Sequence, residues 1–154
     1  MPSATSPDFG VINFRYTRPQ PVELERVQAH NKLSVLIADD NPDIVSTLAA
    51  ILADEGYVVN TCLSGTHALE CIKQYEPDVC LLDIAMPGMT GFELASEVQR
   101  LTLSKRPRLI AISGEYTKET DRLLAQSVGF DHYLVKPADP SVLLRMLEEI
   151  GAQE

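Results

Sequence analysis

The sequence predicts a doubly wound α/β domain, in which helices cover both faces of a five-stranded parallel sheet. From residue 33 onward, short apolar runs alternate five times with segments whose apolar residues recur at helical spacing. Strands that are buried on both faces read as continuous apolar runs, and alternation with helices is typical of parallel sheets. The chain of 154 residues has the length of about one such domain.

The five predicted strands are short and mostly aliphatic or β-branched, as buried strands usually are. They cover residues 33–39, 57–62, 78–83, 108–113 and 131–135.

Five predicted helices follow the strands, each with apolar residues three or four positions apart. In chain order the apolar sets are Ile44, Leu48, Ile51 and Leu52; Ala68, Leu69 and Ile72; Phe92, Ala95 and Val98; Leu123, Leu124 and Val128; and Val142, Leu143, Met146, Leu147 and Ile150. Start and stop signals support them. These are Asp40 or Asn41 before Pro42, Asp139 before Pro140, Thr90 with Glu93 as a capping box, and Gly56 and Gly129 after the first and fourth helices. Residues 89–94 are interpreted only as a loop and a capped helix start.

The first 31 residues differ from the rest of the chain. Prolines punctuate them and their apolar pieces are short, so residues 1–31 are interpreted as a tail or linker. The folded domain is expected over residues 32–154.

Charge and hydropathy exclude two classes of function. The 13 Lys and Arg against 22 Asp and Glu give a net charge of −9, so we expect no direct binding to nucleic acid. No apolar run approaches the ~18 residues of a membrane span, and no export signal is recognisable at the N-terminus. We therefore expect no membrane insertion and a cytoplasmic location.

The cysteines and histidines carry no recognisable motif. Cys62, Cys71 and Cys80 lie in or beside apolar segments without CxxC spacing, and we interpret them as buried, reduced thiols without a functional role. His30 and His67 are interpreted as ordinary surface groups.

Polar residues end several of the predicted strands, and the ends of parallel strands meet at one edge, where ligands bind in open sheets. They are Asp39 and Asp40, Asp83, Ser113 and, just after the last strand, Lys136. Asp40 alone would be only a helix cap, and Lys136 alone only a solvated charge. Their coincidence at one edge predicts a site.

Three carboxylates repel one another in a cleft, and binding of a cation relieves this repulsion. Oxygen ligands without nearby His or Cys favour Mg²⁺. Lys136 and Ser113 supply groups that hold phosphoryl oxygens. Aspartate can also accept phosphate as a nucleophile, and Asp83, between the acidic pair and Lys136, is the candidate.

Residues 33–151 resemble the receiver domain of response regulators in two-component signalling. The motifs that carry the resemblance are ADD, LLDIAMPGMTG, AISG and YLVKP, in the family's order. One such motif would be weak evidence, but together in register they are specific. The resemblance implies a flavodoxin-like (βα)5 sandwich with strand order 2-1-3-4-5.

The resemblance also implies roles at the acidic edge. Asp83 would be the phosphoacceptor, and Lys136 would pair with the phosphoryl group. Asp40, Asp83 and the backbone carbonyl of Ala85 would contact Mg²⁺ directly, and Asp39 would contact it through water.

A conformational switch is implied as well. Ser113 would move to hydrogen-bond the phosphoryl group, Tyr133 would turn inward behind it, and the bond from Lys136 to Pro137 would be cis. The surface that changes would lie at about residues 117–150.

The implied partners are a histidine kinase or histidine phosphotransfer protein and an unknown downstream protein. Because the chain ends shortly after its last predicted helix, output by protein contact is expected. Both a stand-alone receiver and the terminal receiver of a hybrid kinase, which GFDHYLVKPADPSVLLRML resembles, stay open.

The residues also bear on three alternative functions. A Mg²⁺-dependent aspartyl-phosphate phosphohydrolase carries a second aspartate two residues after its nucleophile, where this chain has Ala85; we therefore expect slow hydrolysis and no enzyme activity beyond the domain's own phosphoryl transfer and dephosphorylation. A flavin-binding domain is disfavoured because the three aspartates would repel its phosphate. A phosphate-sink receiver stays open, since Ala85 and Glu115 occupy positions that tune the phosphate lifetime in the family.

Overall fold

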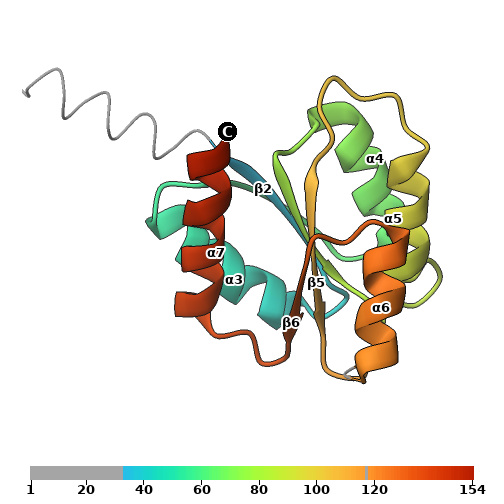
Figure 1. The fold of residues 1–154 in the computed structure, drawn as a ribbon. Coiled ribbons are helices and arrows are strands. Elements are labelled where there is room, and N and C mark those ends of the chain that lie inside the picture. Colours follow the sequence, from blue (N-terminus) through green and yellow to red (C-terminus); the bar gives the residue numbers. More distant parts are fainter. Residues whose placement is uncertain (1–32, 117) are drawn as a thin grey trace, which may run out of the picture. The chain divides into compact units, whose positions relative to one another are not determined.

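The computed structural model describes residues 33–116 and 118–154. The predicted tail or linker over residues 1–31 lies outside the described residues. From residue 33 the chain alternates between strands and helices (Figure 1). The strands are β2 (Ser34–Ala38), β3 (Val58–Cys62), β4 (Val79–Asp83), β5 (Arg108–Ser113) and β6 (His132–Val135). The helices are α3 (Pro42–Asp54), α4 (Gly65–Tyr75), α5 (Gly91–Gln99), α6 (Glu119–Val128) and α7 (Pro140–Gln153). Each predicted strand agrees with the observed one to within one residue at either end.

The five strands form one parallel sheet in the order β3-β2-β4-β5-β6. Numbered along the described chain, this is the predicted order 2-1-3-4-5, and the doubly wound flavodoxin-like fold is confirmed. The chain runs from β2 to one neighbour, β3, and then crosses to the other, β4. The strand order therefore reverses between β2 and β4, which in open α/β sheets is where ligands bind.

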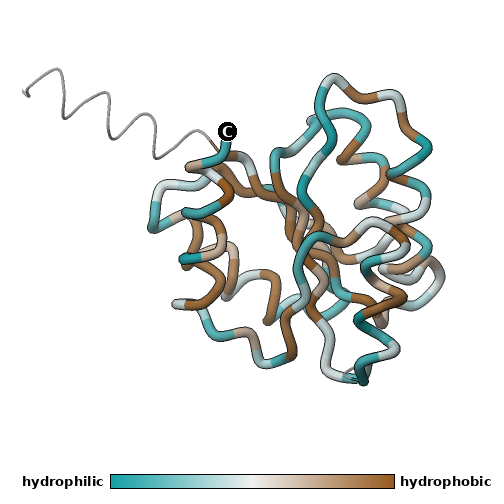
Figure 2. Tube along the Cα trace, viewed as in Figure 1, coloured by the Kyte–Doolittle hydropathy of each residue, from teal (hydrophilic) through white to brown (hydrophobic). Residues whose placement is uncertain are grey.

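Two hydrophobic layers hold the helices on the sheet. Helices α4, α5 and α6 cover one face through buried residues such as Ile72, Leu94 and Ala125, and α3 and α7 cover the other through residues such as Leu52 and Leu147. Figure 2 shows hydrophobic residues concentrated along the central strands and on the helix sides nearest to them. Burial on both faces explains why the strands read as continuous apolar runs.

The helix caps follow the sequence signals. Asn41 Oδ1 accepts a hydrogen bond of 2.9 Å from the Asp43 backbone N–H at the start of α3, so Asn41, and not Asp40, is the cap. Asp139 caps α7 in the same way. Thr90 and Glu93 form the predicted capping box of α5.

Two predictions about burial were wrong. Leu123 and Leu124 were assigned to the apolar side of their helix, but they are 59% and 46% exposed, because α6 faces the sheet through Ala125. Cys71 was expected to be buried and is only half-buried, since it lies at the side of α4 beside the exposed His67. In the part of the chain that the structure describes, none of the helices is long and apolar enough to cross a membrane.

Candidate functional site

The carboxyl ends of β2, β4 and β5 bring polar side chains to one edge of the sheet. Asp39 follows β2 directly, Asp83 is the last residue of β4, and Ser113 is the last residue of β5. Asp39 and Asp83 are 3% and 4% exposed, and Ser113 is fully buried. Because β2 and β4 are neighbours at the reversal of strand order, both buried aspartates lie at the expected ligand position.

A cleft of about 330 Å³ opens at this edge, lined by all three predicted aspartates together with Ala85, Glu115 and Lys136. Carboxylate oxygens of Asp39, Asp40 and Asp83 lie within 4.8 Å of one another. Asp40 is exposed, whereas the other two aspartates are buried. Solvent therefore reaches the cluster at Asp40, and the buried carboxylates of Asp39 and Asp83 form its base.

Lys136 completes the charge arrangement. Its Nζ lies 2.8 Å from Asp39 Oδ2 and 3.3 Å from Asp83 Oδ1. The Lys136 backbone N–H donates to the Ser113 carbonyl at 2.9 Å, and the peptide bond from Lys136 to Pro137 is cis, as the resemblance implied. The backbone between β6 and α7 thus holds the ammonium over both buried carboxylates.

The ionisable groups of the cleft influence one another. Burial raises the pKa of Asp83 above its usual value, and repulsion by Asp39 raises it further; Lys136 opposes both effects without cancelling them. Burial alone would lower the pKa of Lys136, but Asp39 and Asp83 together outweigh it and the pKa is raised. Lys136 is therefore a cation at neutral pH, and added positive charge at Asp83 would relieve an electrostatic cost.

The backbone around Asp83 is tightly packed against the start of α5. The Ala85 N–H donates to Asp83 Oδ1 at 3.3 Å, and the Gly91 N–H donates to the Ile84 carbonyl at 2.9 Å. A Cβ atom at Gly91 would lie 2.6 Å from the Asp83 carbonyl oxygen. Residue 91 therefore has no room for a side chain beside the Asp83 backbone, a constraint that the sequence interpretation of residues 89–94 missed. The only signal was a glycine directly after a helix cap.

Ser113 lies beside the cleft with its hydroxyl bonded to the following loop. Its Oγ accepts hydrogen bonds from the backbone N–H groups of Tyr116, at 3.0 Å, and Glu115, at 3.2 Å. The hydroxyl oxygen thus ties together the loop after β5, and neither of these two bonds uses the O–H proton of Ser113.

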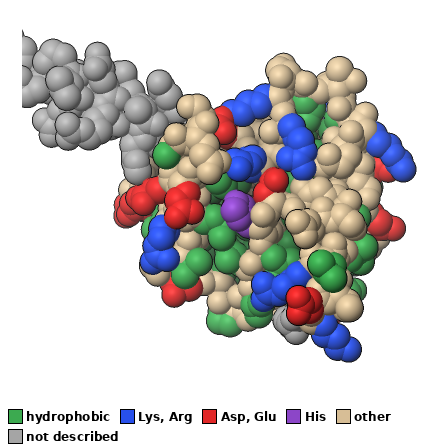
Figure 3. Space-filling view, in the orientation of Figure 1, with side chains coloured by type: hydrophobic (Ala, Val, Ile, Leu, Met, Phe, Trp, Pro, Cys, Tyr) green, Lys and Arg blue, Asp and Glu red, His purple; other side chains and the backbone are tan. Residues whose placement is uncertain are grey.

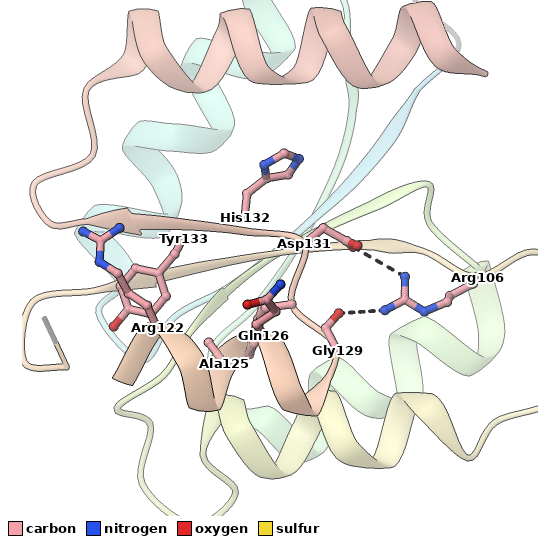
Figure 4. A pocket seen from close by; sticks show the side chains of 9 residues that line it. Arg106, Arg122, Ala125, Gln126, Gly129, Asp131, His132 and Tyr133 are labelled. Atoms are coloured by element: carbon pink, nitrogen blue, oxygen red, sulfur yellow. Dashed lines mark hydrogen bonds and ion pairs between the residues drawn. The ribbon is translucent and has the colours of Figure 1, made fainter. Parts of the chain in front are cut away.

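Tyr133 lies on the α6 side of β6, away from the lysine cleft. It lines a second cavity of about 440 Å³ with Arg122 and Arg106, and the Arg122 guanidinium lies 5.2 Å from the centre of the tyrosine ring (Figure 4). Burial raises the pKa of the Tyr133 phenol, while the nearby Ser113 side chain lowers it. That contact falls short of hydrogen-bond geometry, so the buried Tyr133 hydroxyl has no hydrogen-bond partner among the described residues.

The structure therefore brings Asp39, Asp40, Asp83, Ala85 and Lys136 together in one cleft. Ser113 ends the neighbouring strand β5. Tyr133 lies on β6, on the side of the sheet that α6 covers.

A five-stranded doubly wound sheet with an acidic cluster and a lysine at its switch point defines a receiver-type signalling domain. Residues 35–148 match the protein family described as the response regulator receiver domain, and the chain belongs to that family.

Individual relatives agree with this assignment. The chain is 32% identical over 119 residues to protein PilH of Pseudomonas aeruginosa, an alignment that covers 77% of this chain and 97% of PilH. It is 33% identical over 120 residues to response regulator GtcR of Aneurinibacillus migulanus, covering 78% of this chain but only 47% of GtcR. The chain thus spans nearly all of the first relative and about half of the second.

Solved structures show the same fold. The chemotaxis protein CheY4 of Vibrio cholerae superposes with a TM-score of 0.72 at 32% identity, covering 77% of this chain and 98% of CheY4. A CheY-like receiver domain protein from Methanospirillum hungatei gives a TM-score of 0.72 at 28% identity, covering 79% of this chain and 94% of that protein.

Proposed function

We propose that Asp83 accepts a phosphoryl group from a histidine kinase or histidine phosphotransfer protein, and that the modified domain presents a changed surface to a downstream protein. The observation that carries this proposal is the position of Lys136, whose ammonium contacts both Asp39 and Asp83 at the base of an open cleft. A cation beside a buried carboxylate provides the charge that an incoming phosphoryl group needs.

The donor set of the cleft fits Mg²⁺. Three aspartates gather their oxygens within 4.8 Å. Ala85 lines the same cleft, and its backbone carbonyl would add a further oxygen donor. Sulfur and imidazole ligands are absent from the cleft lining among the described residues, which favours a hard cation. Asp39, Asp40, Asp83 and Ala85 are the residues that would hold it. The bound ion would neutralise the carboxylates and polarise the phosphoryl oxygens.

The transfer step is a displacement at phosphorus. A carboxylate oxygen of Asp83 attacks the phosphorus of a phosphohistidine, so that an acyl phosphate P–O bond forms and the P–N bond breaks. The electron pair of the P–N bond stays on the imidazole nitrogen of the donor. Lys136 stabilises the negative charge of the phosphoryl oxygens during the transfer.

The surface next to the acceptor suits docking of the donor. Ile44 and Leu48 of α3 and Pro137 and Ala138 of the loop after β6 line a largely apolar groove of about 460 Å³, which also includes Lys136. A partner that packs apolar side chains in this groove would bring its phosphohistidine to the lysine side of the cleft.

The output surface is proposed at α6, β6 and α7, within residues 117–150. Leu123 and Leu124 of α6 and Val135 of β6 are large hydrophobic side chains exposed there. Figure 3 shows hydrophobic side chains over β6 and its two flanking helices, with charged side chains around them. Movement of Ser113 toward the phosphoryl group would free space near Tyr133. The Tyr133 hydroxyl, which has no hydrogen-bond partner among the described residues, would gain one by turning inward behind Ser113.

The alternative of a phosphohydrolase is less well supported. Ala85 has no acid or base to activate water beside Asp83, so hydrolysis of the acyl phosphate is expected to be slow. The domain would then act as a signalling module that catalyses at most its own phosphorylation and dephosphorylation.

The test uses the full chain, an acyl phosphate of low mass such as acetyl phosphate, and Mg²⁺. Intact-mass spectrometry should show addition of one phosphoryl group to the wild-type protein and none to Asp83→Asn. Asp54→Asn, which changes an exposed aspartate at the far end of α3 from the cleft, is the matched control and should be labelled like the wild type. Labelling of Asp83→Asn at the wild-type level would refute the assignment.

A further inference from the structure

A second cluster of ligating side chains lies where β3 meets α4. Cys62 ends β3, and His67 and Cys71 belong to α4. One ligand atom from each of the three side chains lies within 4.8 Å of the other two, and the two sulfur atoms are 3.1 Å apart. These residues are separate from the oxygen-lined cleft described above.

The local fold explains this convergence. Ser64 caps α4 by accepting a hydrogen bond from the His67 backbone N–H at 3.2 Å, and only two residues separate the end of β3 from the start of α4. His67 and Cys71 are four residues apart and therefore share one side of α4. Because α4 packs on the sheet through Ala68 and Ile72, that side adjoins the end of β3.

Burial in the cluster is graded from core to surface. Cys62 is 2% exposed, Cys71 is half-buried and His67 is exposed. An ion could therefore enter at His67, with its inner ligand in the core and a solvent molecule on its outer side.

We propose that Cys62, His67 and Cys71 bind one thiophilic divalent cation of the Zn²⁺ type, with water as the fourth ligand. Binding forms two metal–sulfur bonds and one metal–nitrogen bond and releases the two thiol protons to solvent. The two thiolates cancel the charge of the cation, so the half-buried site stays neutral. Three protein ligands and one water molecule are a common tetrahedral arrangement for zinc.

The distances permit this arrangement with small side-chain movements. Zinc–sulfur bonds of about 2.3 Å at a tetrahedral angle place two sulfur atoms about 3.8 Å apart. The two thiols, now 3.1 Å apart, would separate by less than ~1 Å. The alternative, a disulfide, needs the sulfurs to approach to about 2.05 Å.

The experiment titrates Co²⁺ into the full chain, whose cysteines a phosphine reductant keeps reduced. Excess Mg²⁺ is present so that it, and not Co²⁺, occupies the acidic cleft. Co²⁺ substitutes for Zn²⁺ and reports thiolate ligation by a charge-transfer absorption band. One equivalent of Co²⁺ should produce this band, and one equivalent of Zn²⁺ should abolish it. Loss of outer-shell partners already weakens metal sites about 10–100-fold, so Cys71→Ser and His67→Gln should each weaken binding by at least about tenfold.

Cys80→Ala is the matched control, since Cys80 is a fully buried thiol outside the cluster, and this variant should bind Co²⁺ like the wild type. Circular dichroism checks that each variant is folded. The proposal is wrong if no thiolate band appears, if the band is unchanged in Cys71→Ser, or if the reduced wild type forms a disulfide between Cys62 and Cys71 in preference to binding Co²⁺. None of these results would bear on phosphorylation of Asp83.

Discussion

The ammonium of Lys136 lies 2.8 Å from Oδ2 of Asp39, a carboxylate that is only 3% exposed. Lys136 is the one cationic side chain among the residues described as lining this cleft, which also holds the carboxylates of Asp40, Asp83 and Glu115. The pairing balances part of this negative charge and leaves the rest to attract a divalent cation. The cleft thus has a cation at its base and carboxylates at its rim, an arrangement that supports the proposed binding of a phosphoryl group together with a metal ion.

Replacing Lys136 by Gln should impair both function and stability. We expect phosphorylation by acetyl phosphate to slow by about 100-fold, the cost of losing one preorganised charge at a reacting group. Without Mg²⁺, the variant should also lose about 1–3 kcal/mol of unfolding free energy, because Asp39 is left buried without its partner. Rates from intact-mass spectrometry and urea unfolding measure the two effects.

Lys105→Gln is the control for that prediction, since Lys105 pairs with Asp78 and Glu154, and Asp78 lies at the opposite, amino end of β4. It should be phosphorylated at the wild-type rate. An equal slowing in both variants would indicate a general charge effect and contradict a specific role of Lys136.

Mg²⁺ should stabilise the folded domain through the three aspartates. Any ligand that binds only the folded state adds stability, about 2.7 kcal/mol at 100 times its dissociation constant. Asp40→Asn should largely abolish the rise of the melting temperature with Mg²⁺ and should itself fold normally, because Asp40 is exposed and does not cap α3. Asp54→Asn is the matched control. A full response in Asp40→Asn would exclude Asp40 as a ligand.

The raised pKa of Asp83 predicts how pH affects stability in the absence of Mg²⁺. The folded state holds the Asp83 proton more tightly than the unfolded state, whose pKa is near 3.8. The resulting stabilisation is complete below pH 3.8 and is lost as pH rises through the folded pKa. Asp83→Asn does not titrate there, so its stability relative to the wild type should increase over that window and then level off. Urea unfolding at a series of pH values measures the difference, and a decrease over the same window would contradict the prediction.

Much of the fold and the composition of the cleft could be predicted from the sequence, because the signals are local. An aspartate at the end of an apolar run, such as Asp83, lies at the edge of the sheet as soon as the run forms a parallel strand. Asn41 and Asp139 mark helix starts by hydrogen bonds that span two residues. These features need no knowledge of how the helices pack.

Features that depend on packing between elements could not be predicted. The spacing of Leu123 and Leu124 does not reveal that α6 faces the sheet through Ala125. The approach of Cys62 and Cys71 depends on how α4 lies against β3, and the spacing C-x8-C resembles no known metal motif. The lack of room at Gly91 follows from the path of Asp83 and Ile84, which only the assembled site shows.

Gly91→Ala should disturb the backbone at Asp83, the proposed acceptor, without changing any polar group of the site. The added Cβ would lie 2.6 Å from the Asp83 carbonyl oxygen and 2.8 Å from the Ile84 Cα, and backbone atoms cannot move aside cheaply. We expect a loss of about 1–3 kcal/mol in unfolding free energy and slower phosphorylation. At Gly114 an added Cβ would meet only Lys136 side-chain carbons, at 3.5 Å and beyond, so Gly114→Ala should cost less than about 0.5 kcal/mol. Equal losses in both variants would refute a positioning role for Gly91.

Ala85→Asp should shorten the lifetime of the phosphorylated domain. Ala85 lines the cleft two residues after Asp83, and its backbone N–H donates to Asp83. If Asp83 carries the proposed acyl phosphate, a carboxylate at residue 85 would lie near the water molecule that attacks it. A well-placed general base accelerates a reaction by about 10²–10⁴-fold. An introduced carboxylate that is not ideally oriented should still accelerate hydrolysis of the acyl phosphate by at least about tenfold. Ala85→Asn has the same size without the basic group and should change the lifetime less. The decay of the phosphorylated mass after removal of the donor measures both variants. Faster decay of Ala85→Asn than of Ala85→Asp would mean that size or polarity at residue 85, and not a missing base, controls the loss of phosphate.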